Sequence, residues 1–282
     1  MKLGTALRLG RVSNLPTVWT NTLAGAVLAG AGAYGARFAL MLLAFSLFYT
    51  GGMFLNDAFD ARIDAVQRPE RPIPSGDIGA RAVFAWGYGM MALGTVMLAW
   101  FGVASALAGL TLAVAITFYD WHHKQNVFGP VVMGLCRVLV YVGAGLCITL
   151  ALPDRLWLGA ALIWCYLVGL TYVAKQENLD RVENLWPLLF LAAPVAGGAW
   201  LAAAQPAAGV FWLLFTGWML VALWFLRRRA KGDVPRAVVS LIAGIALLDA
   251  LLIAAAGAPA LAALALAGFA VTWFLQRYIA GT

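Results

Sequence analysis

Four side chains with oxygen donors recur between residues 56 and 64, directly after a long apolar segment. Asn56, Asp60 and Asp64 stand four residues apart, and Asp57 lies three residues before Asp60. On a helix these spacings place all four on one face. Carboxylates so close together repel one another unless cations lie among them, and oxygen donors without nearby Cys or His favour Mg²⁺ completed by water and phosphate oxygens. The pattern predicts a magnesium site for a diphosphate, with all four as metal ligands and the three aspartates as catalytic groups.

The segment after this cluster is basic and rich in turn-forming residues. Arg68 and Arg71 would supply fixed cationic donors for diphosphate oxygens. Three prolines and a glycine between residues 69 and 76 make the chain stiff and able to fold back over the acidic face. Simple solvation of a helix end is the alternative, but aspartates there oppose the negative end of the helix dipole, a cost that bound cations would offset.

These two segments together resemble the first aspartate-rich motif of the UbiA superfamily of intramembrane prenyltransferases. The resemblance rests on the run Asn56-Asp-x-x-Asp-x-x-x-Asp64 followed by Arg71-Pro-x-x-x-Gly76. The sequence of the second run is similar to that of the chlorophyll-synthase branch. It implies an all-helical bundle that transfers a prenyl group from a prenyl diphosphate to an acceptor with Mg²⁺. It also implies that the motif's Asn and Asp side chains bind metal and diphosphate, and that Arg68 and Arg71 contact the diphosphate.

Composition indicates a membrane protein. Of the 282 residues, 63% are hydrophobic and 11% charged, whereas soluble domains have about a quarter charged residues. We expect an all-α, polytopic transmembrane helical bundle of nine, or at most ten, helices with a cytoplasm-facing cavity, forming a single integral-membrane domain over residues 1–282. Stretches of roughly 20 apolar residues place the candidate spans at 15–34, 37–58, 83–103, 104–119, 127–151, 157–175, 186–204, 208–226, 237–256 and 260–276.

The distribution of basic residues predicts the orientation. With the amino terminus inside, 16 of the 19 Lys and Arg residues fall on the cytoplasmic side, two fall outside, and Arg137 lies within a span. The acidic cluster then faces the cytoplasm, as do the connections that follow the fourth and sixth spans. Because the basic residues are scattered over loops rather than gathered on one module, they argue against nucleic-acid binding.

The connection after the fourth predicted span carries a second polar element. The family pattern there is Tyr-x-x-x-Lys, and this chain offers Tyr119 with His at plus four and Lys124 at plus five. We interpret Tyr119 and Lys124 as diphosphate-binding or acceptor-binding residues. An ordinary interfacial loop is the alternative, because Tyr, Trp and Lys are common at membrane surfaces.

The connection after the sixth predicted span departs from the family pattern Asp-x-x-x-Asp, which the resemblance associates with a second Mg²⁺. Here Lys175 precedes Glu177 and Asp180. Glu177 is the candidate for a second metal ligand or general base, Asp180 for a further metal ligand, and Lys175 for a phosphate contact; a self-paired helix end is equally open. The wording Tyr172-Val-Ala-Lys-Gln-Glu177 is similar to that of the UbiA-like proteins named EboC, which implies a bacterial cell membrane.

Two charged residues lie inside predicted spans. Arg137 and Asp249 both fall about 15 to 18 Å deep at 1.5 Å per residue, so either a mutual ion pair or a cavity-lining role would explain them. We also predict Asn14, Asn21 and Tyr172 at the cavity, with hydrogen bonds between helices as the alternative for both asparagines.

Two functions remain open on these residues. The first is Mg²⁺-dependent prenyl transfer from a prenyl diphosphate to a hydrophobic or small acceptor within the membrane lipid. The second is a transporter or lipid-diphosphate-binding protein on the same fold, without chemistry. The sequence shows no sign of the inverted repeats common in transporters, which favours the first. Neither the acceptor nor the prenyl length follows from the sequence.

Overall fold

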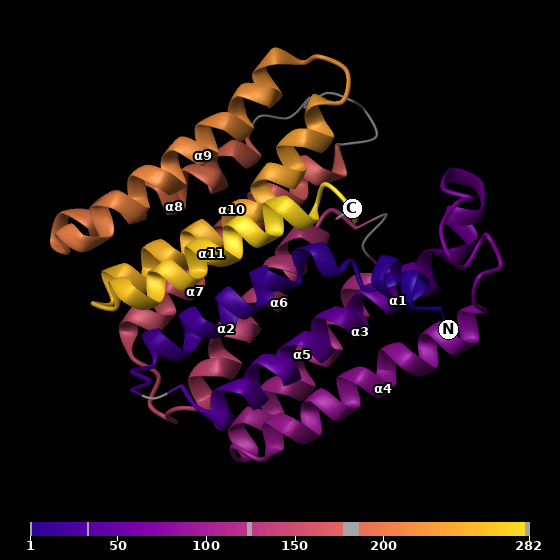
Figure 1. Ribbon diagram of the computed structural model, residues 1–282, viewed down its shortest axis with the longest axis horizontal. Helices are drawn as coiled ribbons and strands as arrows, with labels where there is room; N and C mark the ends of the chain where they lie inside the picture. The colour runs from indigo at the N-terminus through magenta and orange to yellow at the C-terminus, as the bar shows by residue number, and fades with distance from the viewer. Residues whose placement is uncertain (1, 33, 123–125, 177–185, 280–282) are drawn as a thin grey trace.

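The computed structural model is a bundle of α-helices, described for residues 2–32, 34–122, 126–176 and 186–279 (Figure 1). These residues contain no strand and two short 3-10 helices, η1 (Val12–Asn14) and η3 (Pro206–Ala208). The α-helices are α1 (Leu3–Leu9), α2 (Leu15–Leu28), α3 (Ala36–Gln67), α4 (Ala80–Ala99), α5 (Val103–His122), α6 (Gly129–Leu146), α7 (Asp154–Lys175), α8 (Pro187–Ala204), α9 (Gly209–Arg228), α10 (Asp233–Ala255) and α11 (Pro259–Leu275).

Each of the ten predicted spans coincides with one of the helices α2 to α11. In the described chain, seven helical segments are long and apolar enough to cross a membrane, and residues 188–204 and 259–275 form shorter apolar helices. The prediction of an all-α integral membrane protein is therefore confirmed. α2 is shorter than the predicted span 15–34 because Gly30 adopts a φ of 94° and ends the helical run.

The acidic motif lies within a helix. α3 runs 32 residues to Gln67, about 48 Å, whereas hydropathy alone predicted an end at residue 58. Residues 59–67 include four polar side chains but are compatible with a helix, so α3 continues beyond its apolar part. Of the motif residues, only Asp64 lies in the last turn, so the dipole argument made from the sequence applies to Asp64 alone.

Helices α10 and α2 form the centre of the bundle. In α10, 89% of the most apolar window is buried, against 17% in α9, which lies at the periphery. α2 packs against α3, α6, α10 and α11. A Cβ added at Gly25 of α2 would lie 2.7 Å from the carbonyl oxygen of Tyr141 on α6. This close approach of backbones, which only glycine permits, brings Asn21 and Arg137, each one turn earlier on its helix, side by side.

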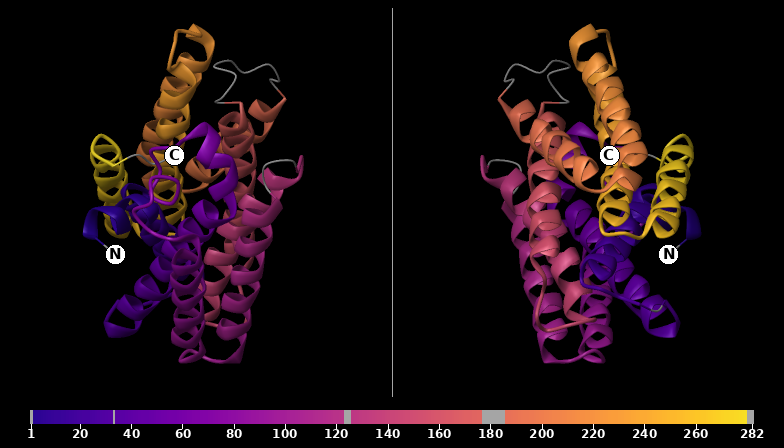
Figure 2. Two further views of the ribbon diagram at one scale, coloured as in Figure 1. Left: turned by 90° about the vertical axis from the view of Figure 1, so that its right-hand side faces the viewer. Right: turned by 90° about the vertical axis from the view of Figure 1, so that its left-hand side faces the viewer.

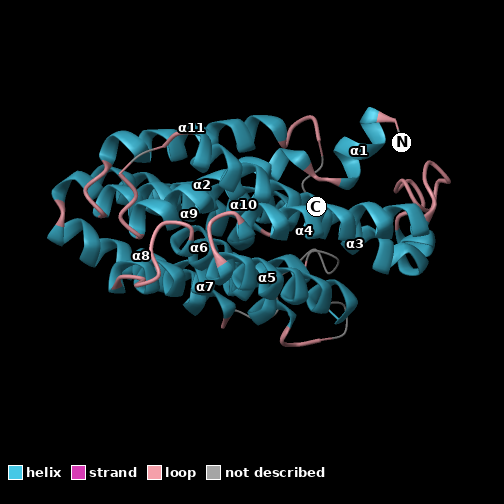
Figure 3. Ribbon diagram, turned by 90° about the horizontal axis from the view of Figure 1, so that it is seen from below, coloured by secondary structure: helices cyan, strands magenta, loops and turns pink. Residues whose placement is uncertain are grey.

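The carboxyl ends of α3, α5 and α7 lie at the same end of the bundle, as Figures 2 and 3 show. At this end, the Tyr172 hydroxyl donates to the carbonyl oxygen of Val127 at 2.8 Å, and Lys175 Nζ donates to that of Asn126 at 2.6 Å. α7 thereby holds the start of the segment that leads into α6. As far as the described residues extend, the prediction that three polar connections share one face of the bundle is confirmed.

Candidate active site

A cavity of about 420 Å³ opens where these helix ends meet. Its wall comes from α3, α5, α6, α7 and α10, together with residues around η1 and the start of α2. Apolar side chains such as Phe45, Phe48 and Ile245 line one part. The polar lining is Arg11, Asn14, Tyr49, Asn56, Asp60, Asp64, Gln67, Arg68, Arg71, Tyr119, Asp120, Arg137, Thr171 and Lys175. A polar mouth above an apolar interior can hold a ligand with a charged head and a hydrocarbon tail.

The motif residues share one buried face of α3, as their spacing predicts. Asn56, Asp57, Asp60 and Asp64 are only 8%, 5%, 5% and 2% exposed. Asn56, Asp60 and Asp64 line the cavity, whereas Asp57 lies beside it without lining it. The spacing places the carboxylates correctly, but it does not reveal which of them faces the open space.

The connection after α3 folds back onto this face. Arg71 Nη1 lies 2.7 Å from Asp64 Oδ2 and 3.2 Å from Asp57 Oδ1. A turn in which the amide of Ser75 donates to the carbonyl oxygen of Arg71 at 2.9 Å shapes the segment, and Gly76 takes a φ of 81°. The predicted role of the proline-rich and glycine-containing segment is therefore supported by its path, and Arg71 supplies the positive charge that the buried carboxylates require.

Arg11 is a second cation at the acidic face, although from the sequence it is only one of the 16 basic residues assigned to the cytoplasmic side. Its Nη2 lies 3.1 Å from both Asn56 Oδ1 and Asp57 Oδ1. Burial acts to lower the pKa of the Arg11 guanidinium, but Asp57 and nearby negative groups raise it above its ordinary value, so the side chain remains charged. Its backbone has a φ of 41°, and the Tyr49 hydroxyl donates to its carbonyl oxygen at 3.2 Å.

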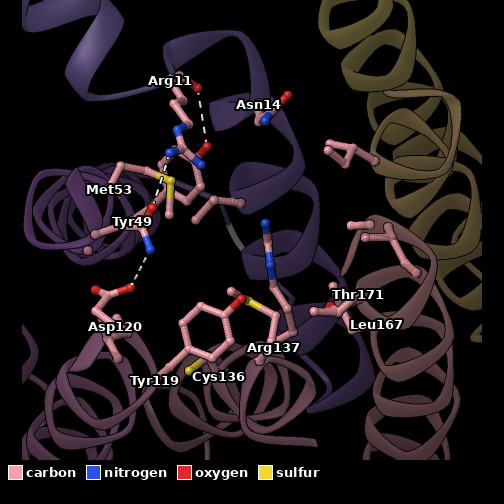
Figure 4. Close-up of a pocket in the computed structure, with 18 of the residues that line it drawn as sticks. Arg11, Asn14, Tyr49, Met53, Tyr119, Asp120, Cys136, Arg137, Leu167 and Thr171 are labelled. Carbon is pink, nitrogen blue, oxygen red and sulfur yellow. Dashed lines mark hydrogen bonds between the residues drawn. The ribbon is translucent and has the colours of Figure 1, made fainter. Parts of the chain in front are cut away.

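Asp120 is a further residue of the cavity for which the sequence predicted no role. It lies in the last turn of α5, which extends to His122 instead of ending at residue 119, and it is 3% exposed. Asn56 Nδ2 donates to Asp120 Oδ1 at 3.1 Å. Figure 4 shows the resulting chain of contacts from Arg11 through the α3 side chain to Asp120. The only local signal was its position immediately after Tyr119, the residue chosen from the family pattern.

Deeper in the bundle, Arg137 and Asp249 do not form the direct ion pair considered from the sequence. Arg137 Nη1 donates to Asn21 Oδ1 at 2.7 Å, and Asn21 Nδ2 donates to Asp249 Oδ2 at 2.7 Å. Arg137 lines the cavity, whereas Asn21 and Asp249 are fully buried behind it. The prediction that Asn21 and Asp249 line the cavity is therefore corrected: close packing of α2, α6 and α10 places them in a buried hydrogen-bonded cluster.

The remaining predicted residues fall into three groups. Arg68, Tyr119, Lys175 and Asn14 line the cavity. Tyr172 does not line it, because its hydroxyl turns to the carbonyl oxygen of Val127. Three residues with predicted roles lie outside the described residues: Lys124, Glu177 and Asp180.

The described residues contain no preformed cluster of three or more His, Cys, Asp or Glu side chains that could hold a metal ion. Two of the motif carboxylates are instead paired with arginine. Mg²⁺, however, is usually bound through one or two carboxylates together with water and substrate phosphates. The cavity offers oxygen donors of this kind from Asn56, Asp60, Asp64 and Asp120, so the donor set fits Mg²⁺ bound with a diphosphate.

The comparison that decides the family covers most of the chain. The model of the UbiA prenyltransferase family matches residues 18–238, which include α3, α5 and α7 and most of the residues that line the cavity. The chain belongs to this family. The resemblance drawn from the first aspartate motif is thus confirmed by a match that covers all of the helices from α3 to α9.

Among curated relatives, this UbiA family chain is similar to two archaeal proteins named digeranylgeranylglyceryl phosphate synthase. It is 30% identical to the protein of Methanopyrus kandleri over 64% of this chain and 63% of the relative. It is 33% identical to that of Metallosphaera sedula over 38% of each chain. The matched segments thus span less than two thirds of these relatives' lengths.

Solved structures show the same UbiA fold. A structure reported for digeranylgeranylglyceryl phosphate synthase in membranes has a TM-score of 0.67 at 17% identity and covers 90% of this chain and 98% of that one. A UbiA homologue from Archaeoglobus fulgidus bound to GPP and Mg²⁺ has a TM-score of 0.61 at 18% identity, over 90% of this chain and 99% of that one. At these identities the likeness establishes the fold alone.

Proposed function

We propose that this UbiA family protein transfers a prenyl group from a prenyl diphosphate to an acceptor held in the same cavity. One observation carries the proposal: an acidic face with Asn56, Asp60 and Asp64, flanked by Arg68 and Arg71, borders an apolar cavity inside a membrane bundle. The name of the curated relatives denotes a prenylated lipid phosphate. The Archaeoglobus UbiA homologue binds GPP and Mg²⁺, which supports the same pair of ligands here.

The arginines are placed to exchange partners when a diphosphate enters. Arg71 and Arg11 contact the carboxylates in the structure, and both line the cavity. Their planar guanidinium groups can donate two parallel hydrogen bonds to phosphate oxygens. Asn56, Asp60 and Asp64 would hold Mg²⁺ together with the diphosphate, and the metal would supply positive charge for the leaving group. Fixed cations around the developing charge favour departure of diphosphate.

The apolar part of the cavity surrounds the prenyl group and determines which nucleophile reacts with its first carbon. The bond between the first prenyl carbon and the diphosphate oxygen breaks, and the diphosphate leaves with the electron pair. An acceptor nucleophile bonds to that carbon and then loses a proton. Phe45, Phe48 and Ile245 line the part of the cavity suited to the prenyl chain and exclude water, so the acceptor captures the allylic cation before hydrolysis occurs.

The orientation and cellular location belong to the same proposal. The excess of Lys and Arg on the connections at the cavity mouth supports a mouth that faces the cytoplasm. The similarity around Tyr172 to the EboC proteins supports a bacterial cell membrane, whereas the curated relatives named above are archaeal. Selective permeabilisation of cells carrying a single-cysteine label in the segment 72–79 would test the orientation.

The direct test is binding and turnover of radiolabelled geranyl, farnesyl and geranylgeranyl diphosphate by the purified full-length protein in detergent. We expect binding that requires Mg²⁺ and that weakens by at least about tenfold, or ~1.4 kcal/mol, in Asp60→Ala. Asp77→Ala is the matched control, because Asp77 is an exposed carboxylate paired with Arg8 outside the cavity. Unchanged binding in Asp60→Ala would refute the proposal.

A product assay separates the enzyme from the transporter or binding protein considered from the sequence. Release of diphosphate together with a prenylated acceptor supports transfer. Tight Mg²⁺-dependent binding without turnover, across aromatic, quinone-precursor and glycerol-phosphate acceptors, would favour the binding function. The same panel tests whether the acceptor resembles that implied by the relatives' name.

A further inference from the structure

A dense group of basic residues connects α9 to α10. The ten positions from 227 to 236, called the basic turn from here on, hold a single carboxylate, Asp233. They also hold five exposed cations, Arg227, Arg228, Arg229, Lys231 and Arg236. The basic turn lies at the same end of the bundle as the cavity mouth (Figure 2), but none of its residues lines the cavity. These charges are therefore separate from the candidate active site.

Asp233 fixes the shape of the basic turn. Its side chain is only 1% exposed. Arg228 donates to it through both Nε and Nη2, with Nε 2.8 Å from Oδ2. Arg236 Nη1 lies 3.4 Å from Oδ1, and the backbone amide of Ala230 donates to Oδ2 at 2.9 Å. One carboxylate thus closes the loop and holds two of the five cations, so the basic turn is a defined structure and not a solvated run of charges.

The other three cations face outward without partners. Arg227, Arg229 and Lys231 have no hydrogen bond or ion pair to any described residue. Arg229 takes a φ of 55°, a left-handed conformation that residues other than glycine rarely adopt. It ends α9 there, and α10 begins four residues later at Asp233. Within so tight a reversal the three cations cannot separate far, and their summed field favours an anion beside them.

The surface of α9 next to the basic turn is apolar, which favours a lipid over a soluble anion. Trp224 is 53% exposed, and its ring centre lies 4.5 Å from the guanidinium carbon of Arg228. One turn earlier, Leu220 and Val221 are 62% and 40% exposed. Tryptophan is enriched at the membrane–water interface, and Arg228 lies about 6 Å further along the helix. The order of apolar, aromatic and cationic side chains matches the acyl chains, glycerol and phosphate of a phospholipid.

We propose that the basic turn binds the phosphate group of an anionic phospholipid in the leaflet on the side of the cavity mouth. Clusters of four or more Lys and Arg residues directly after a membrane helix are typical of such binding. Arginine donates paired hydrogen bonds to phosphate oxygens. The inference goes beyond the proposed prenyl transfer and does not depend on it, because the basic turn contributes nothing to the cavity wall.

A basic turn that only reflects topology predicts a different result. The excess of Lys and Arg on one side of a membrane protein requires no particular arrangement, so any loss of three charges on that side would weaken binding of an anionic lipid equally. The test variant therefore combines Arg227→Gln, Arg229→Gln and Lys231→Gln. The matched control removes three exposed basic residues that the sequence assigns to the same side and that lie outside the cavity: Lys2→Gln, Arg62→Gln and Arg81→Gln.

Binding is measured by titrating short-chain phosphatidylglycerol, zwitterionic phosphatidylcholine of the same chain length and free glycerol phosphate into the full-length protein in neutral detergent. We expect phosphatidylglycerol to bind about tenfold more tightly than phosphatidylcholine. The preference should persist in the control and disappear in the test variant. An absent preference, or an equal loss in both variants, overturns the inference. Glycerol phosphate that binds the basic turn as tightly as phosphatidylglycerol shows a site for a soluble phosphate and overturns the lipid assignment.

Asp233→Asn separates the arrangement of the charges from their number. The substitution removes a negative charge but loosens Arg228 and Arg236, which Asp233 holds. If the arrangement matters, the preference for phosphatidylglycerol should weaken even though the basic turn becomes more positive. A stronger preference shows that net charge alone attracts the lipid, and it overturns the inference of a built site.

A further measurement needs no variant, in case a substituted protein does not fold. Phosphatidylglycerol with a photoreactive diazirine close to its phosphate is photolysed with the wild-type protein in phosphatidylcholine nanodiscs, and the labelled peptides are identified by mass spectrometry. Labelling concentrated on residues 224–236 and displaced by unlabelled phosphatidylglycerol supports the inference. Labelling spread evenly over the connections on this side overturns it. Displacement by polyglutamate at a lower concentration than by phosphatidylglycerol indicates an acidic protein segment as the partner and also overturns it.

Discussion

Arg71 Nη1 lies 2.7 Å from Asp64 Oδ2 and connects the segment after α3 to the last turn of the acidic face. The carboxyl of Asp64 is 2% exposed and the guanidinium side chain 15%. Breaking a buried ion pair by removing one partner leaves an uncompensated charge. The contact therefore neutralises the acidic face in the structure and keeps a phosphate-binding group within reach of it.

Arg71→Gln should weaken prenyl diphosphate binding by about ten to a hundredfold, because a hydrogen bond to a charged group contributes about 1.5–3 kcal/mol. Arg71→Lys should recover part of the affinity through its charge but not the paired geometry of the guanidinium. Binding of radiolabelled geranyl diphosphate with Mg²⁺ measures both. Arg81→Gln, which removes an exposed arginine at the start of α4, is the charge-matched control, and a loss as large in that variant would contradict the assignment.

Asp120 should contribute to activity although no sequence motif points to it. Its Oδ1 accepts from Asn56 Nδ2, so Asp120→Ala removes both a negative charge and the partner that orients Asn56. We expect at least about a tenfold fall in turnover with the fold retained, since an orphaned buried donor costs about 1–3 kcal/mol. Asp120→Asn preserves an acceptor for Asn56 and removes only the charge. If both variants turn over prenyl diphosphate at the wild-type rate, Asp120 has no part in the site.

Metal removal should separate donor binding from folding. Because Mg²⁺ is expected to bind with the diphosphate, EDTA should abolish the thermal stabilisation that geranyl diphosphate produces and leave the melting temperature of the ligand-free protein unchanged. Ligand at a hundred times its dissociation constant stabilises by about 2.7 kcal/mol, so the lost shift is measurable. Restoration by Mg²⁺ is the positive control. A shift that persists in EDTA would show metal-independent binding.

Gly25→Val should destabilise the bundle, because a Cβ at this position would lie 2.7 Å from the carbonyl oxygen of Tyr141. Forcing α2 away from α6 costs about 1–3 kcal/mol and also separates Asn21 from Arg137. Thermal unfolding in detergent measures the loss. Gly89→Ala, a helical glycine with open space around its Cβ position, should be neutral or slightly stabilising. Equal melting temperatures for Gly25→Val and wild type would contradict the close packing.

The sequence was sufficient to predict the class of protein and the acidic face of α3. Apolar stretches define membrane helices because the bilayer requires every backbone polar group to be paired within the span, so all ten predicted spans coincide with helices. Helical periodicity alone places Asn56, Asp60 and Asp64 on one face. The end of α3 was predicted wrongly because hydropathy marks where a helix leaves the apolar environment, not where it stops.

Only the tertiary structure decided which distant residues contact that face or line the cavity beside it. Arg11, Asp120 and Arg137 come from three separate elements. No local pattern shows that Arg11 is more than a topological charge, that Asp120 is more than a loop residue, or that Arg137 is more than an ion-pair partner. Their roles depend on contacts across the bundle, such as Arg11 with Asp57 and Asn21 with Arg137. Those contacts depend on how closely the helices approach one another. Glycines such as Gly25 determine that distance. Periodicity specifies the face of one helix, but the packing of all the helices determines what that face meets.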